Sequence, residues 1–148
     1  MATSPTTSPR DNYLQTEVMT AAPQKLQLML IEAAIRQGKQ ALNLWQQADA
    51  ETDDRIGDTL VRCQQIVTEL LCGLNPEQDR ELVRRVASIY LFVFRSLTEA
   101  HLQRDQQKLV DALEVLEVER ETWREVCQKL GTRRETSGQQ EEGASFEA

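Results

Sequence analysis

Apolar side chains recur every three or four residues along most of the chain, which is the spacing of one face of an α-helix. The pattern occurs in one short segment and four long ones, separated by brief polar connections. It predicts helices over residues 12–19, 23–47, 54–71, 77–102 and 106–130. All five segments are assigned from helical spacing and none from the alternation of apolar and polar residues typical of a β-strand, so the sequence predicts an all-α protein.

Residues with known preferences for helix ends support these boundaries. Pro23 suits a first helical turn, and Asp105 is placed to cap the last helix. Gly73 and Pro76 end the third segment, and we expect Gly131 to stop the last helix after Leu130.

Short connections make neighbouring long helices antiparallel, so we expect an antiparallel up-and-down four-helix bundle with an additional short N-terminal helix. That short helix, residues 12–19, needs support from the rest of the molecule, because so short a helix is unstable in water. The polar composition of the two ends predicts a disordered tail over residues 1–11 and another over 131–148, which leaves 12–130 as one domain.

Two of the helices carry more apolar surface than a bundle core needs. In 23–47, one stripe includes Ile31, Ile35 and Leu42, and a second includes Leu26 and Leu30. Burial by the short N-terminal helix would explain the surplus, and so would a groove for the amphipathic helices of a partner. The sequence leaves open which stripe faces the core.

Composition and charge restrict the kinds of partner. The chain has a net charge of −7, which opposes binding to nucleic-acid phosphates. Its apolar runs are shorter than the roughly 20 residues that cross a bilayer, so we expect no membrane insertion. The first residues do not have the pattern of a signal peptide, and we expect a cytoplasmic protein whose three cysteines are reduced core residues.

Candidate catalytic groups are few, and we expect neither an enzyme nor a cofactor. His101 is the single histidine, and the cysteines lie too far apart for a zinc site, so we expect no metal. One alternative is a histidine phosphotransfer domain that uses His101, although the Lys and Gly that usually flank such a histidine are missing. The other alternative is a helical-bundle adaptor for protein interactions.

The stretch YLQTEVMTAAPQKLQLML, residues 13–30, resembles the opening of the flagellar secretion chaperone family, FliS. Ile31, Glu32 and Ala33 depart from the Tyr-Asp-Gly that the family usually has next, and His101 replaces an Asn. Further matches follow in the family's order at Ala34, Ile35, Arg36, Tyr90, Arg95, Leu97, Glu99, Ala100, Asp105, Glu121, Thr122 and Trp123.

The resemblance implies a chaperone that binds the disordered C-terminal segment of flagellin one-to-one and prevents premature polymerisation. It also implies delivery to components of the export gate, and the uncovered stripe would allow a weak homodimer. We expect a movable N-terminal cover over a groove for the partner. The cover residues are Tyr13, Leu14 and Val18, and the groove residues are Ile31, Ile35, Leu42, Ile66 and Leu70.

Overall fold

The computed structural model describes residues 23–47, 52–77 and 79–145. Within these ranges the chain forms four α-helices and no strand, which confirms the all-α class. The helices are α2 (Pro23–Gln46), α3 (Thr52–Cys72), α4 (Arg80–Gln103) and α5 (Gln106–Ser145). The predicted helix at 12–19 lies outside the described residues.

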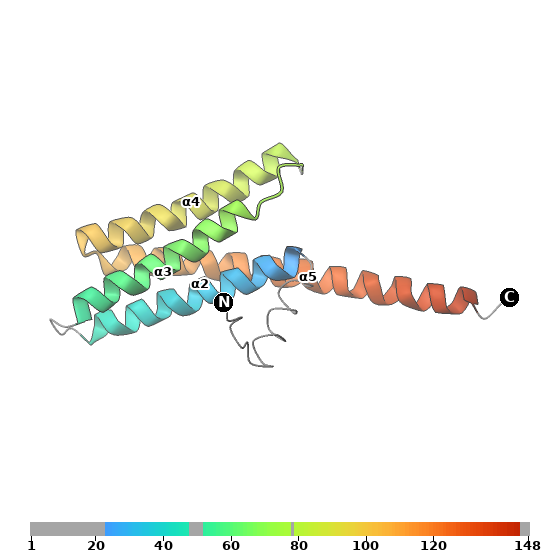
Figure 1. Ribbon diagram of the computed structural model, residues 1–148, viewed down its shortest axis with the longest axis horizontal. Coiled ribbons are helices and arrows are strands. Elements are labelled where there is room, and N and C mark those ends of the chain that lie inside the picture. Colours follow the sequence, from blue (N-terminus) through green and yellow to red (C-terminus); the bar gives the residue numbers. More distant parts are fainter. Residues whose placement is uncertain (1–22, 48–51, 78, 146–148) are drawn as a thin grey trace, which may run out of the picture.

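Each helix packs against two others: α2 and α4 each lie against both α3 and α5. Figure 1 shows the four helices side by side, with α5 continuing well past the others toward the C-terminus. The core lies between them and consists mainly of aliphatic side chains. Its largest fully buried members are Tyr90, Ile31, Leu60, Leu70, Leu97, Leu109, Leu116, Val67, Val93 and Cys63.

Side-chain caps fix the helix ends around the two short connections. The carboxylate of Asp79 accepts a hydrogen bond from the backbone N–H of Glu81, so α4 begins at Arg80 rather than near Glu77. Asp105 accepts from the backbone N–H of Gln107 at 3.0 Å, which confirms the predicted cap of α5.

The predicted end of the last helix at Leu130 is wrong, because α5 runs on through Gly131 to Ser145. Gly131 does not adopt a positive φ, so it does not form the left-handed turn that ends many helices. A glycine inside a helix costs only about 1 kcal/mol relative to alanine, which the helix formers around it can offset. Residues 131–145 are therefore helical where we expected a disordered tail; the division of the chain at 12 and 130 stays a prediction.

The three cysteines occupy different environments. Cys63 is buried, donates a hydrogen bond from its thiol to the carbonyl oxygen of Ala34, and has its pKa raised to about 12 by burial. Cys72 is exposed at the end of α3, and Cys127 is half-buried. All three are free, but only Cys63 is the core residue that the sequence predicted.

Candidate protein-binding grooves

The first half of α2 keeps a row of apolar side chains at the surface. Gln27, Ile31 and Ala34 of this helix point into the core, and so does Ile35. The remaining apolar positions are only half-buried: Leu26, Leu28, Met29, Leu30 and Ala33. Neither predicted stripe lies wholly in the core. Ile31 and Ile35 of the first stripe are buried, but Leu42 is only half-buried. Leu26 and Leu30 of the second stripe are half-buried, whereas Ala41 and Leu44 further along the helix are buried.

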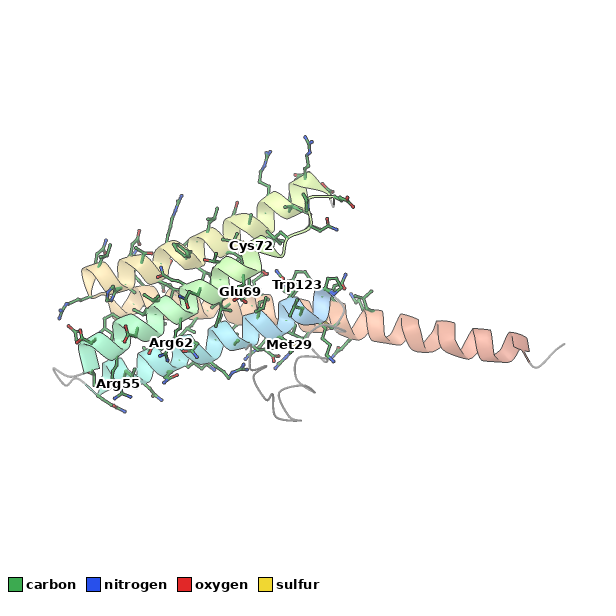
Figure 2. All side chains as sticks on the ribbon, viewed as in Figure 1. Met29, Arg55, Arg62, Glu69, Cys72 and Trp123 are labelled. Carbon is green, nitrogen blue, oxygen red and sulfur yellow. The ribbon has the colours of Figure 1, made fainter. Side chains whose placement is uncertain are left out.

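A groove of about 670 Å³ follows the boundary between α2 and α3. We call it the α2/α3 groove. Figure 2 shows two residues of its lining, Met29 on α2 and Glu69 on α3. The lining is mostly apolar, with charged groups at its rim, and comprises Pro23, Leu26, Gln27, Met29, Leu30, Glu32, Ala33, Arg36, Glu69 and Gly73.

A second groove, of about 700 Å³, lies between α2 and α5. Leu28, Cys127 and Leu130 give it an apolar lining, and Lys25 adds positive charge. Arg124 also lines the groove, but it is paired with Glu32 and Glu121. Burial raises the pKa of the Cys127 thiol, while the charge of Lys25 acts in the opposite direction. An apolar side chain that enters this α2/α5 groove would therefore lie beside the ammonium group of Lys25.

A smaller hollow of about 390 Å³ connects the two grooves around the start of α2. It shares Pro23 and Gln27 with the α2/α3 groove and Gln24 with the α2/α5 groove. Leu74 and Trp123 complete its apolar lining. The three hollows thus adjoin one another around the start of α2.

A cluster of polar side chains beside these hollows, which we call the polar bracket, is buried or half-buried, and two of its members, Gln27 and Trp123, also line the hollows. The amide of Gln27 donates to the Tyr90 hydroxyl at 3.2 Å and to the carbonyl oxygen of Leu70 at 3.4 Å. The indole N–H of Trp123 donates to the carboxylate of Glu119 at 3.3 Å. Burial raises the pKa of Tyr90 to about 12 and also raises the pKa of Glu119 above its usual range. The bracket thus involves polar groups of all four helices next to the grooves.

The residues that the sequence proposed for partner binding fall in three places. Ile31, Ile35 and Leu70 are buried in the core, and Leu42 and Ile66 are half-buried against it. The cover residues lie outside the described part of the chain. The partner-binding role of the whole set stays a prediction: Tyr13, Leu14, Val18, Ile31, Ile35, Leu42, Ile66 and Leu70.

Several groove residues were missing from that set although the sequence contained a signal for them. Leu26 and Leu30 belong to the second apolar stripe of α2, and Trp123 and Leu130 belong to the apolar pattern of α5. Leu28 could not be distinguished from a core residue, because periodicity gives a face but not the neighbour that the face meets.

The groups considered for chemistry do not converge in the structure. His101 is exposed at the end of α4, where its ring packs over Gly57 of α3. Among the residues that the structure describes, no three His, Cys, Asp or Glu side chains are grouped so that they could hold a metal ion. The described helices also include none that is long and apolar enough to span a membrane.

The fold and its grooves define an all-helical protein whose described surface carries apolar-lined hollows around the start of α2. Comparison with known proteins identifies the family. A family model described as flagellar protein FliS matches residues 6–130, so the chain belongs to the FliS family.

Curated relatives with the same name agree with this assignment. The flagellar secretion chaperone FliS of Bacillus subtilis is 28% identical over 131 residues, which cover 88% of this chain and 95% of the relative. The FliS proteins of Vibrio cholerae and Salmonella typhimurium are 25% and 26% identical, over 76% and 78% of this chain and 81% and 84% of their own lengths. These matches confirm the family that residues 13–30 resemble, and with it the prediction of a chaperone rather than an enzyme.

Proposed function

We propose that this chain is an export chaperone that binds the disordered C-terminal segment of flagellin in the cytoplasm, one-to-one, before flagellar secretion. The observation that carries the proposal is the apolar stripe of α2 with one groove toward α3 and another toward α5. An amphipathic helix docks by inserting apolar anchors at helical spacing into a groove of this kind. The relatives, which are named flagellar secretion chaperones, support the same function.

In this mechanism the flagellin segment becomes helical as it wraps around the start of α2. Folding on binding typically buries about 1,000–3,000 Å² and costs about 2–5 kcal/mol in ordering, so binding is specific and still reversible. A segment held in this way is withheld from polymerisation until components of the export gate receive it. In the absence of flagellin, the same stripe supports a weak homodimer.

We also propose that the four helices form an up-and-down bundle. The short helix 12–19 is then a removable cover that contacts the bundle through Tyr13, Leu14 and Val18. The half-buried residues that line the grooves make the first direct contacts with flagellin. Leu42 and Ile66 join them where the segment extends along the bundle, whereas Ile31, Ile35 and Leu70 take part only through an opening of the core on binding.

Isothermal titration with the C-terminal segment of the organism's own flagellin tests the proposal. Leu30→Glu places a charge in the α2/α3 groove and should weaken binding at least tenfold, because the carboxylate must be desolvated against apolar surface. Leu91→Glu is the matched control, since Leu91 is an exposed leucine of α4 that does not line the grooves. Absence of binding by the unmodified chain, or equal loss in both variants, would contradict the proposal.

A further inference from the structure

The α2/α3 groove continues beyond its apolar part into a surface that carries arginines. Arg36 lines the groove itself, and Arg62 and Arg55 follow on α3. Figure 2 shows Arg55, Arg62 and Glu69 in a row along α3. These three residues are spaced by seven, which is two helical turns or about 10 Å, so they share one edge of the helix.

Two hydrogen bonds between the helices place Arg36 beside this row. The amide of Gln27 donates to the carbonyl oxygen of Leu70, and the thiol of Cys63 donates to the carbonyl oxygen of Ala34. Residues further along α2 therefore lie opposite residues earlier in α3. By this register Arg36 falls at the level of Arg62. The groove therefore passes from its apolar part to a pair of arginines, and then to Arg55 two turns further on.

These arginines have no ionic partner within the described ranges, although the chain has an excess of acidic residues. All three side chains are exposed, and the ion pairs of the structure involve other arginines and lysines. Asp58 is the one acidic residue of α3 between Arg55 and Arg62, and no ion pair joins it to either. Three cations thus remain available to a partner in a protein whose net charge is −7.

We propose that the α2/α3 groove binds an amphipathic helix whose apolar anchors enter the pocket beside Leu30 and whose acidic residues face Arg36, Arg62 and Arg55. This inference rests on the proposed function and specifies the chemistry of the segment that is bound. Acidic side chains one or two turns beyond the anchors, and again seven residues later, match the spacing of the arginines. The groove lining has two acidic residues: Glu32, which is paired with Arg124, and Glu69, which has no ion pair among the described residues. Glu69 at the apolar end repels acidic groups there, so the order of charges fixes the direction in which the helix lies.

Charge reversal with a matched control tests this inference. The variant Arg36→Glu/Arg62→Glu should bind the flagellin C-terminal segment about tenfold more weakly in 50 mM salt, and the difference should shrink in 500 mM salt because screening removes it. The control is Arg84→Glu/Arg95→Glu, which makes the same change in net charge at two exposed arginines of α4 that have no ion pair in the described structure. Circular dichroism should show both variants folded, since all four side chains are exposed.

The outcomes separate the inference from the function on which it rests. A loss confined to the Arg36/Arg62 variant, with recovery when the facing acidic residues of the flagellin segment are changed to lysine, supports it. Equal loss in both variants indicates general electrostatic attraction and overturns it, as does unchanged affinity in both. If the unmodified chain does not bind the segment, the proposed function fails and the inference fails with it. Binding that is abolished by Leu30→Glu but insensitive to the arginines leaves the function standing and removes only the inference.

Discussion

The two ends of the helical bundle are built differently. At one end, which we call the closed end, small residues bring the helices together: Gly38 lies against Leu113, where an added Cβ would be 2.6 Å from a side-chain carbon, and Gly57 lies against His101. At the other end, the open end, the first ten residues of α4 include no buried side chain, since burial begins at Tyr90. All three hollows lie at the open end.

This difference indicates that the closed end contributes more to stability and the open end more to partner binding. Close packing at the closed end supplies stability, because buried methylene groups and their contacts contribute most of the folding free energy of a small domain. Half-buried side chains at the open end contribute less to stability and remain available to a partner. If this is correct, equivalent changes at the two ends should have separate effects on stability and on binding.

Truncating matched leucines should give the largest contrast. Leu109→Ala, at a fully buried position near the start of α5, should lower the free energy of unfolding by about 3 kcal/mol, since it removes buried atoms and leaves a cavity. Leu28→Ala, in the α2/α5 groove, should lower it by about 1 kcal/mol or less, because its side chain is already half in water. Urea unfolding measures both values.

Binding should show the reverse order for the same pair of variants. Leu28→Ala should weaken binding of the flagellin segment several-fold, and Leu109→Ala should leave it unchanged at temperatures where the variant is folded. Comparable losses of stability in the two variants would mean that the open end is packed as tightly as the closed end.

The polar bracket is the part of the open end whose loss should destabilise the fold most. Gln27→Leu leaves the buried Tyr90 hydroxyl without its amide partner and should cost about 2 kcal/mol. Tyr90→Phe should cost about 1 kcal/mol, because Gln27 keeps its bond to the carbonyl oxygen of Leu70.

A double-mutant cycle makes this prediction sharper. Combining the two changes removes both polar partners, so the double variant should be more stable than the sum of the single losses implies. Strictly additive losses in thermal unfolding would show that the two side chains do not depend on each other.

The sequence predicted the four described helices well, but it did not determine which apolar residues line the grooves. Apolar periodicity located all four described helices, and the cap at Asp105 was correct because a short acidic side chain before a helix has one common use. Which apolar positions of α2 face the core could not be predicted, because both stripes are apolar and the outcome depends on where α3 and α5 lie. In the structure Ile31 is buried in the core, whereas Leu30 lines the α2/α3 groove.

The failures have a similar origin in context. Gly131 was expected to end α5, but glycine ends a helix only when the backbone takes a left-handed turn there. Cys72 lies within the same apolar helical pattern as the core residues of α3, yet it is exposed on the outer side of the helix. Composition and spacing do not encode either outcome, since each depends on the local backbone or on the position of another helix.

Protonation of Glu119 should have a smaller effect than loss of the bracket. Burial raises its pKa in the folded state above the usual value of 4.5, so the folded state binds more protons than the unfolded state just above that pH. Stability should therefore fall as the pH rises through this window, and the penalty should persist at neutral pH. Glu119→Gln removes the charge while its amide oxygen can still accept from Trp123, and it should raise the melting temperature at pH 7 by about 2 °C. The gain in melting temperature should vanish below about pH 4, where Glu119 is protonated and is as neutral as the glutamine that replaces it. A gain that is independent of pH would exclude the buried charge of Glu119 as its cause.

The smallest expected effect lies at the closed end, in the turn between α4 and α5. Arg104 has a φ of 52°, a left-handed conformation that strains a residue with a Cβ, and its backbone N–H caps α4 by donating to Ala100. Its side chain pairs with Asp53 at 2.6 Å, but both groups are largely exposed, and such pairs contribute about 0–1 kcal/mol. Arg104→Gly relieves the strain and gives up the ion pair, so we expect a net gain of about 0.5 kcal/mol. Arg104→Ala separates the two contributions, because it loses the ion pair and keeps the strain, and it should be less stable than both the glycine variant and the unmodified chain. In 1 M salt, where the pair is screened, Arg104→Ala should match the unmodified chain and the advantage of Arg104→Gly should increase. An alanine variant as stable as the glycine variant would show that the left-handed turn carries no strain.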